Sequence, residues 1–92
     1  MYKLIIQPEA TEDMLESFEW YEKQKPGLGY EFLEEVEKGL SQLIINPLYF
    51  SSINTNLRRF KIKRFPFLII YGIEKKNVAI VGVRHMSRKP KF

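Results

Sequence analysis

Apolar residues recur with two different periods along this chain, and the change of period predicts where helices give way to strands. Residues 2–6, YKLII, are a β-branched and aromatic run that predicts a first strand. From Pro8 onward the apolar positions repeat every three or four residues, the period of one helix face, until KPG at residues 25–27 ends the pattern. This first stripe consists of Ala10, Met14, Phe18 and Tyr21.

A second stripe with the helical period predicts another helix over residues 28–45. Its apolar positions are Phe32, Val36, Leu40 and Leu43. The pair Asn46-Pro47 ends it, because a residue before proline disfavours the helical backbone conformation. Only a few residues separate the two helices, so we expect them to lie against each other as a helical hairpin.

Strands are predicted for the rest of the chain, after a polar, turn-rich connection at residues 48–56. Residues 67–73, FLIIYGI, and 78–83, VAIVGV, are apolar on both faces, as expected of strands inside a sheet, and EKKN at 74–77 predicts a hairpin turn between them. Before them, residues 57–65, LRRFKIKRF, alternate along a predicted strand. One face would carry Arg58, Phe60, Ile62 and Arg64, and the other Leu57, Arg59, Lys61, Lys63 and Phe65.

These elements predict one α+β domain over residues 1–92. The order is β-α-α-β-β-β: an N-terminal strand, a helical hairpin and a three-stranded antiparallel meander, with the helices on one face of the sheet. The pattern leaves the order of strands within the sheet open. The predicted core between helices and sheet comprises Phe18, Leu40, Phe60, Ile62, Ile69 and Tyr71.

Charge is divided sharply between the two halves of the chain. Residues 1–50 carry ten acidic and four basic side chains, a net charge of −6, whereas residues 51–92 carry one acidic and eleven basic side chains, a net charge of +10. One interpretation is a solvated basic surface, since most Lys and Arg lie on surfaces. The clustering of the cations favours a surface that binds a polyanion or an acidic partner.

Composition and motifs disfavour several other classes of site. The chain has no cysteine and one histidine, His85, so neither a disulfide framework nor a structural zinc site is expected. No glycine-rich phosphate or dinucleotide motif is present, and we expect no metal and no cofactor. The apolar run near the N-terminus is too short for a signal peptide or a membrane span, which predicts a cytoplasmic protein without a membrane partner.

The candidate for chemistry is a basic ladder, defined as Arg59, Lys61 and Lys63. Alternate residues of a strand project from one face about 6.6 Å apart, close to the spacing of phosphates along a nucleic-acid strand. We expect substitution of Arg59, Lys61 or Arg84 by alanine to leave the fold intact, because exposed charges contribute little to stability. The cations expected to contact a target or nucleic acid are Arg58, Lys63, Arg64, Arg88 and Lys89.

Two long segments of the chain resemble the RelE/ParE superfamily of toxins from bacterial type II toxin–antitoxin modules. Residues 8–47, PEATEDMLESFEWYEKQKPGLGYEFLEEVEKGLSQLIINP, are similar to its helical hairpin, and residues 58–90, RRFKIKRFPFLIIYGIEKKNVAIVGVRHMSRKP, to its three C-terminal strands. The most specific piece is FPFLIIY followed by a hairpin and VRHMSRKP. The resemblance implies a small basic toxin that is neutralised by a cognate antitoxin, whose disordered and often acidic segment wraps it.

Two activities diverge within this superfamily. RelE-like members cut messenger RNA in the ribosome with Lys and Arg side chains, sometimes a His, and usually a C-terminal Tyr or His; ParE-like members inhibit DNA gyrase. By resemblance, Arg59, Lys61, Arg84 and His85 fall where RelE-like catalytic residues would, and His85 would serve as a general base. The tail SRKPKF supplies no Tyr or His after His85, and the ending H-x-x-R-x-P is more similar to the ParE-like, plasmid-stabilisation branch.

Three functions are therefore weighed. The first is a toxin that binds a protein target such as DNA gyrase and inhibits growth. The second is a metal-independent, ribosome-dependent mRNA endoribonuclease, which leaves open whether the chain is an enzyme. The third is a non-toxic RNA- or DNA-binding module.

Overall fold

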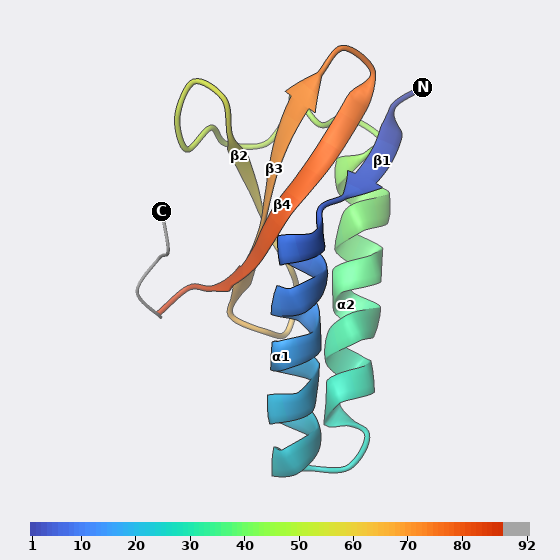
Figure 1. Cartoon of the computed structure of the whole chain (residues 1–92), viewed down its shortest axis with the longest axis vertical. Coiled ribbons are helices and arrows are strands. Elements are labelled where there is room, and N and C mark those ends of the chain that lie inside the picture. The colour runs from blue at the N-terminus through green and yellow to red at the C-terminus, as the bar shows by residue number, and fades with distance from the viewer. Residues whose placement is uncertain (88–92) are drawn as a thin grey trace.

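The computed structural model describes residues 1–87 and contains two helices and four strands in the predicted order (Figure 1). Along the chain they are β1 (Lys3–Ile6), α1 (Pro8–Gln24), α2 (Leu28–Leu43), β2 (Arg58–Lys61), β3 (Phe67–Glu74) and β4 (Asn77–His85). The β-α-α-β-β-β order is confirmed. Strands β3 and β4 are joined by the two-residue turn Lys75-Lys76, in which Lys75 has a positive φ of 57°.

The strands form one sheet in the order β1-β4-β3-β2. β2, β3 and β4 pair antiparallel, as the predicted meander requires, but β1 also joins the sheet and pairs parallel with residues 77–80 of β4. The sheet is therefore four-stranded and mixed, and the description of it as a three-stranded antiparallel unit is corrected. A parallel pair needs a long crossover, which the helical hairpin between β1 and the meander supplies.

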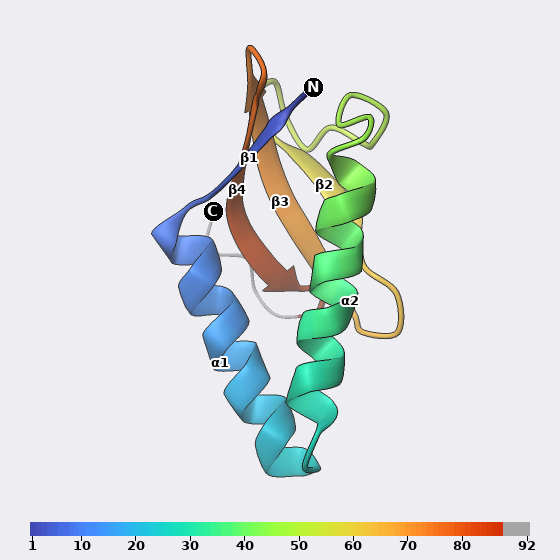
Figure 2. The same cartoon turned by 90° about the vertical axis from the view of Figure 1, so that its right-hand side faces the viewer.

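The helical hairpin packs on the sheet with α1 beside β4 and α2 against β2 and β3 (Figure 2). At the tip of the hairpin the Glu22 carboxylate accepts hydrogen bonds from the N–H groups of Gly27 (3.2 Å) and Gly29 (2.7 Å), which satisfies two donors at the start of α2. A Cβ at Gly29 would lie 2.6 Å from the Phe18 carbonyl oxygen, so only glycine fits where the two helices approach.

The core lies between the hairpin and the sheet, and most of the predicted core residues are in it. Five of the six are buried: Leu40, Phe60, Ile62, Ile69 and Tyr71. Phe18 is half-buried and contacts Tyr30 edge to face. The Tyr71 hydroxyl, enclosed in this core, donates a hydrogen bond to the Pro47 carbonyl (2.7 Å), and burial raises the pKa of Tyr71.

β2 is shorter than the predicted strand over residues 57–65, and it ends at Lys61. Arg64 adopts a left-handed backbone conformation (φ 68°), and its guanidinium pairs with Glu31 (2.5 Å) and Glu35 (3.7 Å) of α2. The chain turns there, so both Ile62 and Phe65 enter the core. The prediction that Phe65 shares a strand face with Arg59 and Lys61 is wrong, because the alternation of side chains between two faces ends where β2 ends.

Candidate functional site

The basic ladder is exposed, and it begins on the edge strand of the sheet. Arg59 and Lys61 lie on β2 and point away from buried Phe60; Lys63 follows in the loop after the strand. Across the sheet Arg59 is opposite Ile70, and Lys61 is opposite Leu68. Within residues 1–87, no carboxylate lies within ion-pair distance of any of the three cations. Their charge is left for solvent or for a partner.

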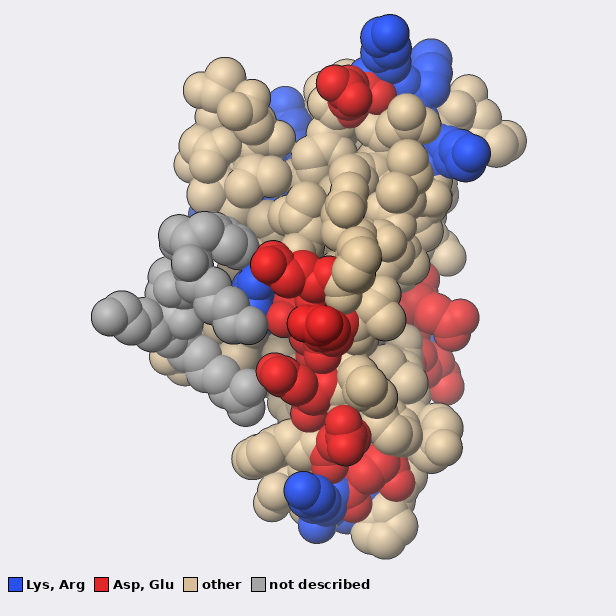
Figure 3. All heavy atoms as spheres, in the orientation of Figure 1, with Lys and Arg blue, Asp and Glu red and all other residues tan. Residues whose placement is uncertain are grey.

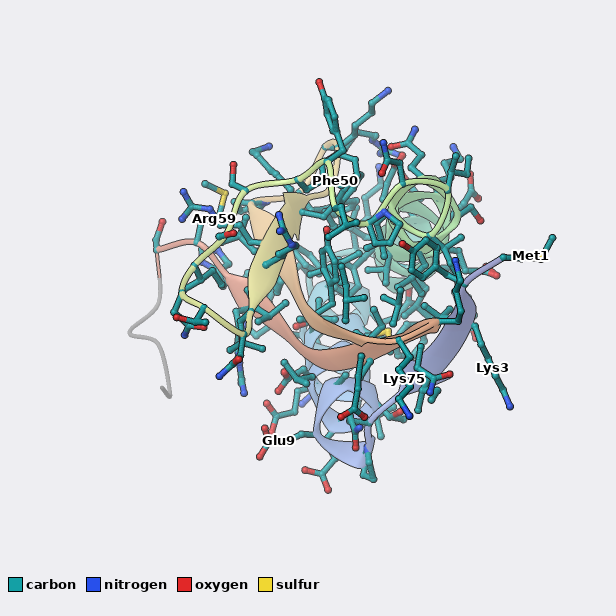
Figure 4. All side chains as sticks on the ribbon, turned by 90° about the horizontal axis from the view of Figure 1, so that it is seen from above. Met1, Lys3, Glu9, Phe50, Arg59 and Lys75 are labelled. Carbon is teal, nitrogen blue, oxygen red and sulfur yellow. The ribbon has the colours of Figure 1, made fainter. Side chains whose placement is uncertain are left out.

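A hollow of about 610 Å³ opens beside the first two cations of the ladder. We name it the β2 hollow; its lining residues are Tyr49, Phe50, Ser51, Arg59, Phe60, Lys61 and Leu68. Phe50 packs edge to face on Phe60, and Tyr49 packs on Phe50 while remaining 76% exposed. Figure 4 shows Arg59 and Phe50 on the β2 side of the molecule. The lining combines apolar walls with two cations and contains no acid, which suits an apolar group that carries negative charge.

Arg84 has a different setting from the ladder, although it lies in the same cross-strand row as Lys61 and Leu68. Its side chain is 13% exposed and pairs with the Asp13 carboxylate of α1 (2.9 Å) and with Glu9 (3.6 Å). The expectation that Arg84 is an exposed cation is therefore wrong, and we now expect loss of its side chain to destabilise the fold. Its predicted catalytic role stays a prediction.

The Asp13 carboxylate of α1 accepts a hydrogen bond from the backbone of β4 beyond the point where β1 ends. β1 pairs with β4 only as far as Ile80, and the Val83 N–H beyond that point donates to the Asp13 carboxylate (3.0 Å). The same carboxylate binds Arg84, and Asp13 itself is 5% exposed. Gly82 leaves the room for this pair, because a Cβ there would lie 3.2 Å from the Arg84 guanidinium and 3.3 Å from Asp13.

His85 lies on the other face of the sheet from the ladder. Successive residues of a strand point to opposite faces, and His85 is opposite Phe67, whose ring it contacts edge to face. Its Nδ1 accepts a hydrogen bond from the Ser87 N–H (3.0 Å). The four predicted catalytic residues thus occupy three separate settings: the ladder, the Asp13 pair and the far face.

The remaining predicted binding residues also separate. Arg58 donates to the carbonyl oxygens of Leu48 (3.1 Å) and Phe50 (2.6 Å), so it holds the loop that forms the hollow. The Arg64 guanidinium pairs with Glu31 of α2, and its hydrogen bond to this carboxylate lowers the pKa of Glu31. Arg88 and Lys89 lie outside the described residues.

Sequence reasoning missed Asp13 and Tyr49. Asp13 follows Ala10 by three residues and so falls beside the buried stripe of the first helix, which is the available signal. Tyr49 and Phe50 were included in a polar connection; two adjacent aromatic residues in such a segment are the available signal.

Acidic side chains of α2 (Glu34, Glu35 and Glu37) line a hollow together with Lys63, whereas those of α1 form a separate group. The face in Figure 3 shows the latter in a column along α1, with a largely uncharged sheet surface above it. The exposed acids of this helix are Glu9, Glu12, Glu16 and Glu19. In residues 1–87 no group of three or more His, Asp or Glu side chains is arranged to hold a metal ion. Neither described helix has the length and apolar character needed to cross a bilayer.

Comparison with known proteins gives a family for this fold and charge distribution. A solved structure described as "Chromosomal ParDE TA system from P. aeruginosa" superposes with a TM-score of 0.84 at 14% sequence identity, covering 95% of this chain and 98% of that chain, which shows a shared fold. No curated protein matches the chain. A model of the family described as "ParE toxin of type II toxin-antitoxin system, parDE" matches residues 4–90. The chain therefore belongs to the ParE toxin family of type II toxin–antitoxin systems.

Proposed function

We propose that this chain arrests bacterial growth by binding a protein target such as DNA gyrase through the basic ladder and the β2 hollow. The observation that carries the proposal is that the ladder cations have no carboxylate partner in the described structure, whereas Arg64, Arg84 and Lys38 each have one. Exposed unpaired cations beside apolar walls add little to stability and suit a binding surface. If the target is a protein such as DNA gyrase, the chain acts in the cytoplasm, and we include this location in the proposal.

An mRNA endoribonuclease is the second candidate, and the geometry favours it less. Cleavage at a 2′-OH needs a general base and cations gathered around one phosphate. His85, the only imidazole, points to the face opposite Lys61, and the Arg84 guanidinium is bound to Asp13. Arginine is always protonated in proteins, so Arg59 is a poor base. A purely nucleic-acid-binding role is the third candidate, supported by charge alone.

Induced expression in a bacterium separates these candidates. We expect growth to stop and a DNA-damage reporter to respond while primer extension finds intact transcripts. His85→Gln should retain most of the growth inhibition; a nuclease would lose about 10²-fold or more of its cleavage with this change. Rapid transcript cleavage that depends on His85 would contradict the binding mechanism, and growth unaffected by the induced chain would contradict the toxin function itself.

We further propose an antitoxin partner with a negatively charged segment. The net charge of +10 on residues 51–92 supplies long-range attraction for such a segment, and added salt should slow association. Co-expression with an adjacent small reading frame should yield a co-purifying complex. Failure of every neighbouring product to bind the chain would contradict this partner.

A further inference from the structure

One edge of the sheet is formed by β1, which in the described residues pairs with β4 alone. The N–H groups of Lys3 (2.7 Å) and Gln7 (2.9 Å) donate to carbonyl oxygens on the β4 side, so the odd-numbered residues of this segment face β4 with their backbone groups. Leu4 and Ile6 must then point their N–H and C=O groups away from the sheet. Within residues 1–87 no backbone hydrogen bond from another segment reaches these groups.

This open edge is also apolar. The side chains of Ile5 and Ile6 are 38% and 41% exposed, although isoleucine is among the residues most often buried. Adjacent residues of a strand point to opposite faces, so one isoleucine is uncovered on each face of the sheet. In Figure 2, which views the molecule from this side, no helix or strand crosses in front of β1. An exposed apolar edge strand is a template for pairing with another strand.

The charges at the two ends of β1 are opposite. Lys3 lies beside the Lys75-Lys76 turn at the start of the strand, whereas Glu9 and Glu12 follow its end in the first turns of α1. All of these side chains are exposed. An antiparallel strand of the same sequence on this edge would bring the cations of each copy near the acids of the other. This complementarity favours a second copy of the chain as the occupant of the edge.

We propose that two copies of this chain associate through β1, antiparallel about a two-fold axis, to form one sheet that runs through both. A register centred on Ile5 sets the two Ile5 side chains against each other and pairs Leu4 with Ile6 through backbone hydrogen bonds. Lys3 then lies opposite Gln7, so no like charges face each other across the new pair of strands.

The opposite edge of the sheet does not offer this contact. Residues 51–53 already lie along part of β2, where the Arg59 N–H donates to the Ser51 carbonyl (3.0 Å). Pairing two β2 strands would also set Arg59 and Lys61 against the same cations, which is destabilising. Association through β1 alone uses the same surface on both copies and therefore closes at the dimer.

Sedimentation velocity of the full chain tests the association. The strand is short and buries little area, so the dimer should be weak and reversible. We expect monomer at about 1 µM and a dimer fraction that rises toward about 1 mM, the range of weak complexes. Added salt should lower this fraction, because opposite charges meet at the interface. A single monomeric species at every concentration would overturn the proposal.

The amides of Leu4 and Ile6 report where the copies meet. In the ¹⁵N-labelled full chain their signals should shift, and their exchange with solvent should slow, as the protein concentration rises. The amides of Lys3 and Ile5 already face β4 and should change less. A dimer whose concentration-dependent changes are confined to α2 or to the ladder would show that β1 is not the interface.

A proline variant tests the backbone pairing. Ile6→Pro removes an N–H that points outward and spares those that face β4, so it should weaken the dimer at least about tenfold. Ile6→Ala keeps this N–H and should weaken the dimer less than about threefold by the loss of apolar contact. Circular dichroism checks that both variants are folded. Equal association of the two variants would contradict pairing through the backbone of β1.

A second pair of variants keeps the test independent of proline. Ile5→Lys would place a cation against its counterpart in the other copy and should weaken the dimer at least about tenfold. Ile53→Lys makes the same change at an isoleucine of similar exposure (40%) in the loop before β2, and the dimer should persist. Equal loss in the two lysine variants would show general repulsion between the chains and would overturn the proposal.

Self-association and growth arrest are separate readouts. Lys3→Ala with Lys75→Ala removes two cations at the start of β1, across the molecule from Arg59 (Figure 4). This double variant should weaken the dimer at least about threefold while the ladder, and with it growth arrest, stays as in the parent. A dimer undiminished in this variant would contradict the charge complementarity. The proposed function fails through the growth assay alone, whatever the state of association.

Discussion

At the scale of single residues, Lys61 and Arg84 lie in one cross-strand row with Leu68 between them. Their charged groups nevertheless differ in exposure and in ion-pair partners. Lys61 is exposed and has no ion-pair partner in the described residues, whereas Arg84 is largely buried against Asp13. A buried ion pair is costly to break because one charge is left without compensation. We infer that Arg84 and Asp13 hold α1 to β4, and that Lys61 is kept for binding.

This difference predicts opposite outcomes for two alanine variants. Arg84→Ala leaves the Asp13 carboxylate buried and should lower the free energy of unfolding by about 3–5 kcal/mol. Lys61→Ala should change it by under about 0.5 kcal/mol. Urea unfolding followed by circular dichroism measures both, with Glu9→Gln as a control for the exposed partner of Arg84. Equal stability of the Arg84 and Lys61 variants would show that the Asp13 pair does not hold the fold.

Arg64 and Glu31 predict a pH dependence. The hydrogen bond from Arg64 lowers the pKa of Glu31 from its ordinary value of 4.5, so the folded state favours the ionised carboxyl. The stabilisation is fully present above about pH 4.5 and is lost as the pH falls through the folded pKa. Glu31→Gln should therefore melt below the parent at pH 7 and converge with it in acid.

The control for this dependence is Glu37→Gln, an exposed position on the same helix with no ion pair in the described residues. Its melting temperature should stay at a constant offset from the parent across the same pH range. A Glu31→Gln deficit that persists undiminished at pH 2 would show that the carboxylate charge is not what Arg64 recognises.

At the scale of elements, the helical hairpin depends on close approach at its tip. Gly29 fits against the Phe18 carbonyl and the Glu22 side chain, and Glu22 in turn caps α2. Gly29→Ala should cost about 1–3 kcal/mol of unfolding free energy, the usual cost of overpacking. Gln24→Ala, at an exposed position of α1, is the matched control for thermal unfolding. An unchanged melting temperature for Gly29→Ala would mean that the helices separate at the tip without cost.

Both helices and the β3–β4 hairpin could be predicted from the sequence because each is marked by a hydrophobic pattern that runs over a long contiguous segment. β2 could not be bounded, since its end depends on Arg64 reaching Glu31, 33 residues earlier in the chain. The place of β1 beside β4 is likewise a long-range pairing that no local pattern contains. At the site, alternation correctly placed Arg59 and Lys61 on the exposed face. Nothing local indicated that Arg84 would find Asp13 rather than solvent.

At the scale of the whole molecule, the exposed acids of α1 form a column along that helix (Figure 3), whereas Arg59 and Lys61 of the ladder lie on β2. Such a field steers an acidic partner toward the ladder and away from α1. The rate of association with the antitoxin should therefore fall with ionic strength, and the steepness of this fall should decrease in the Arg59→Ala, Lys61→Ala double variant. Stopped-flow fluorescence at several salt concentrations measures the dependence; an identical slope for this variant and the parent would contradict steering by the ladder.

We propose that the basic ladder is where this ParE-family chain acts on its target, and growth arrest on induction is the direct test of this role. The parent, the Arg59→Ala, Lys61→Ala double variant and the Lys3→Ala, Lys75→Ala control are expressed at matched levels in the same bacterium, and cell density is followed after induction. We expect arrest by the parent and the control and continued growth with the ladder variant, whose fold should be intact. Arrest by the ladder variant as rapid as that by the parent would contradict the claim.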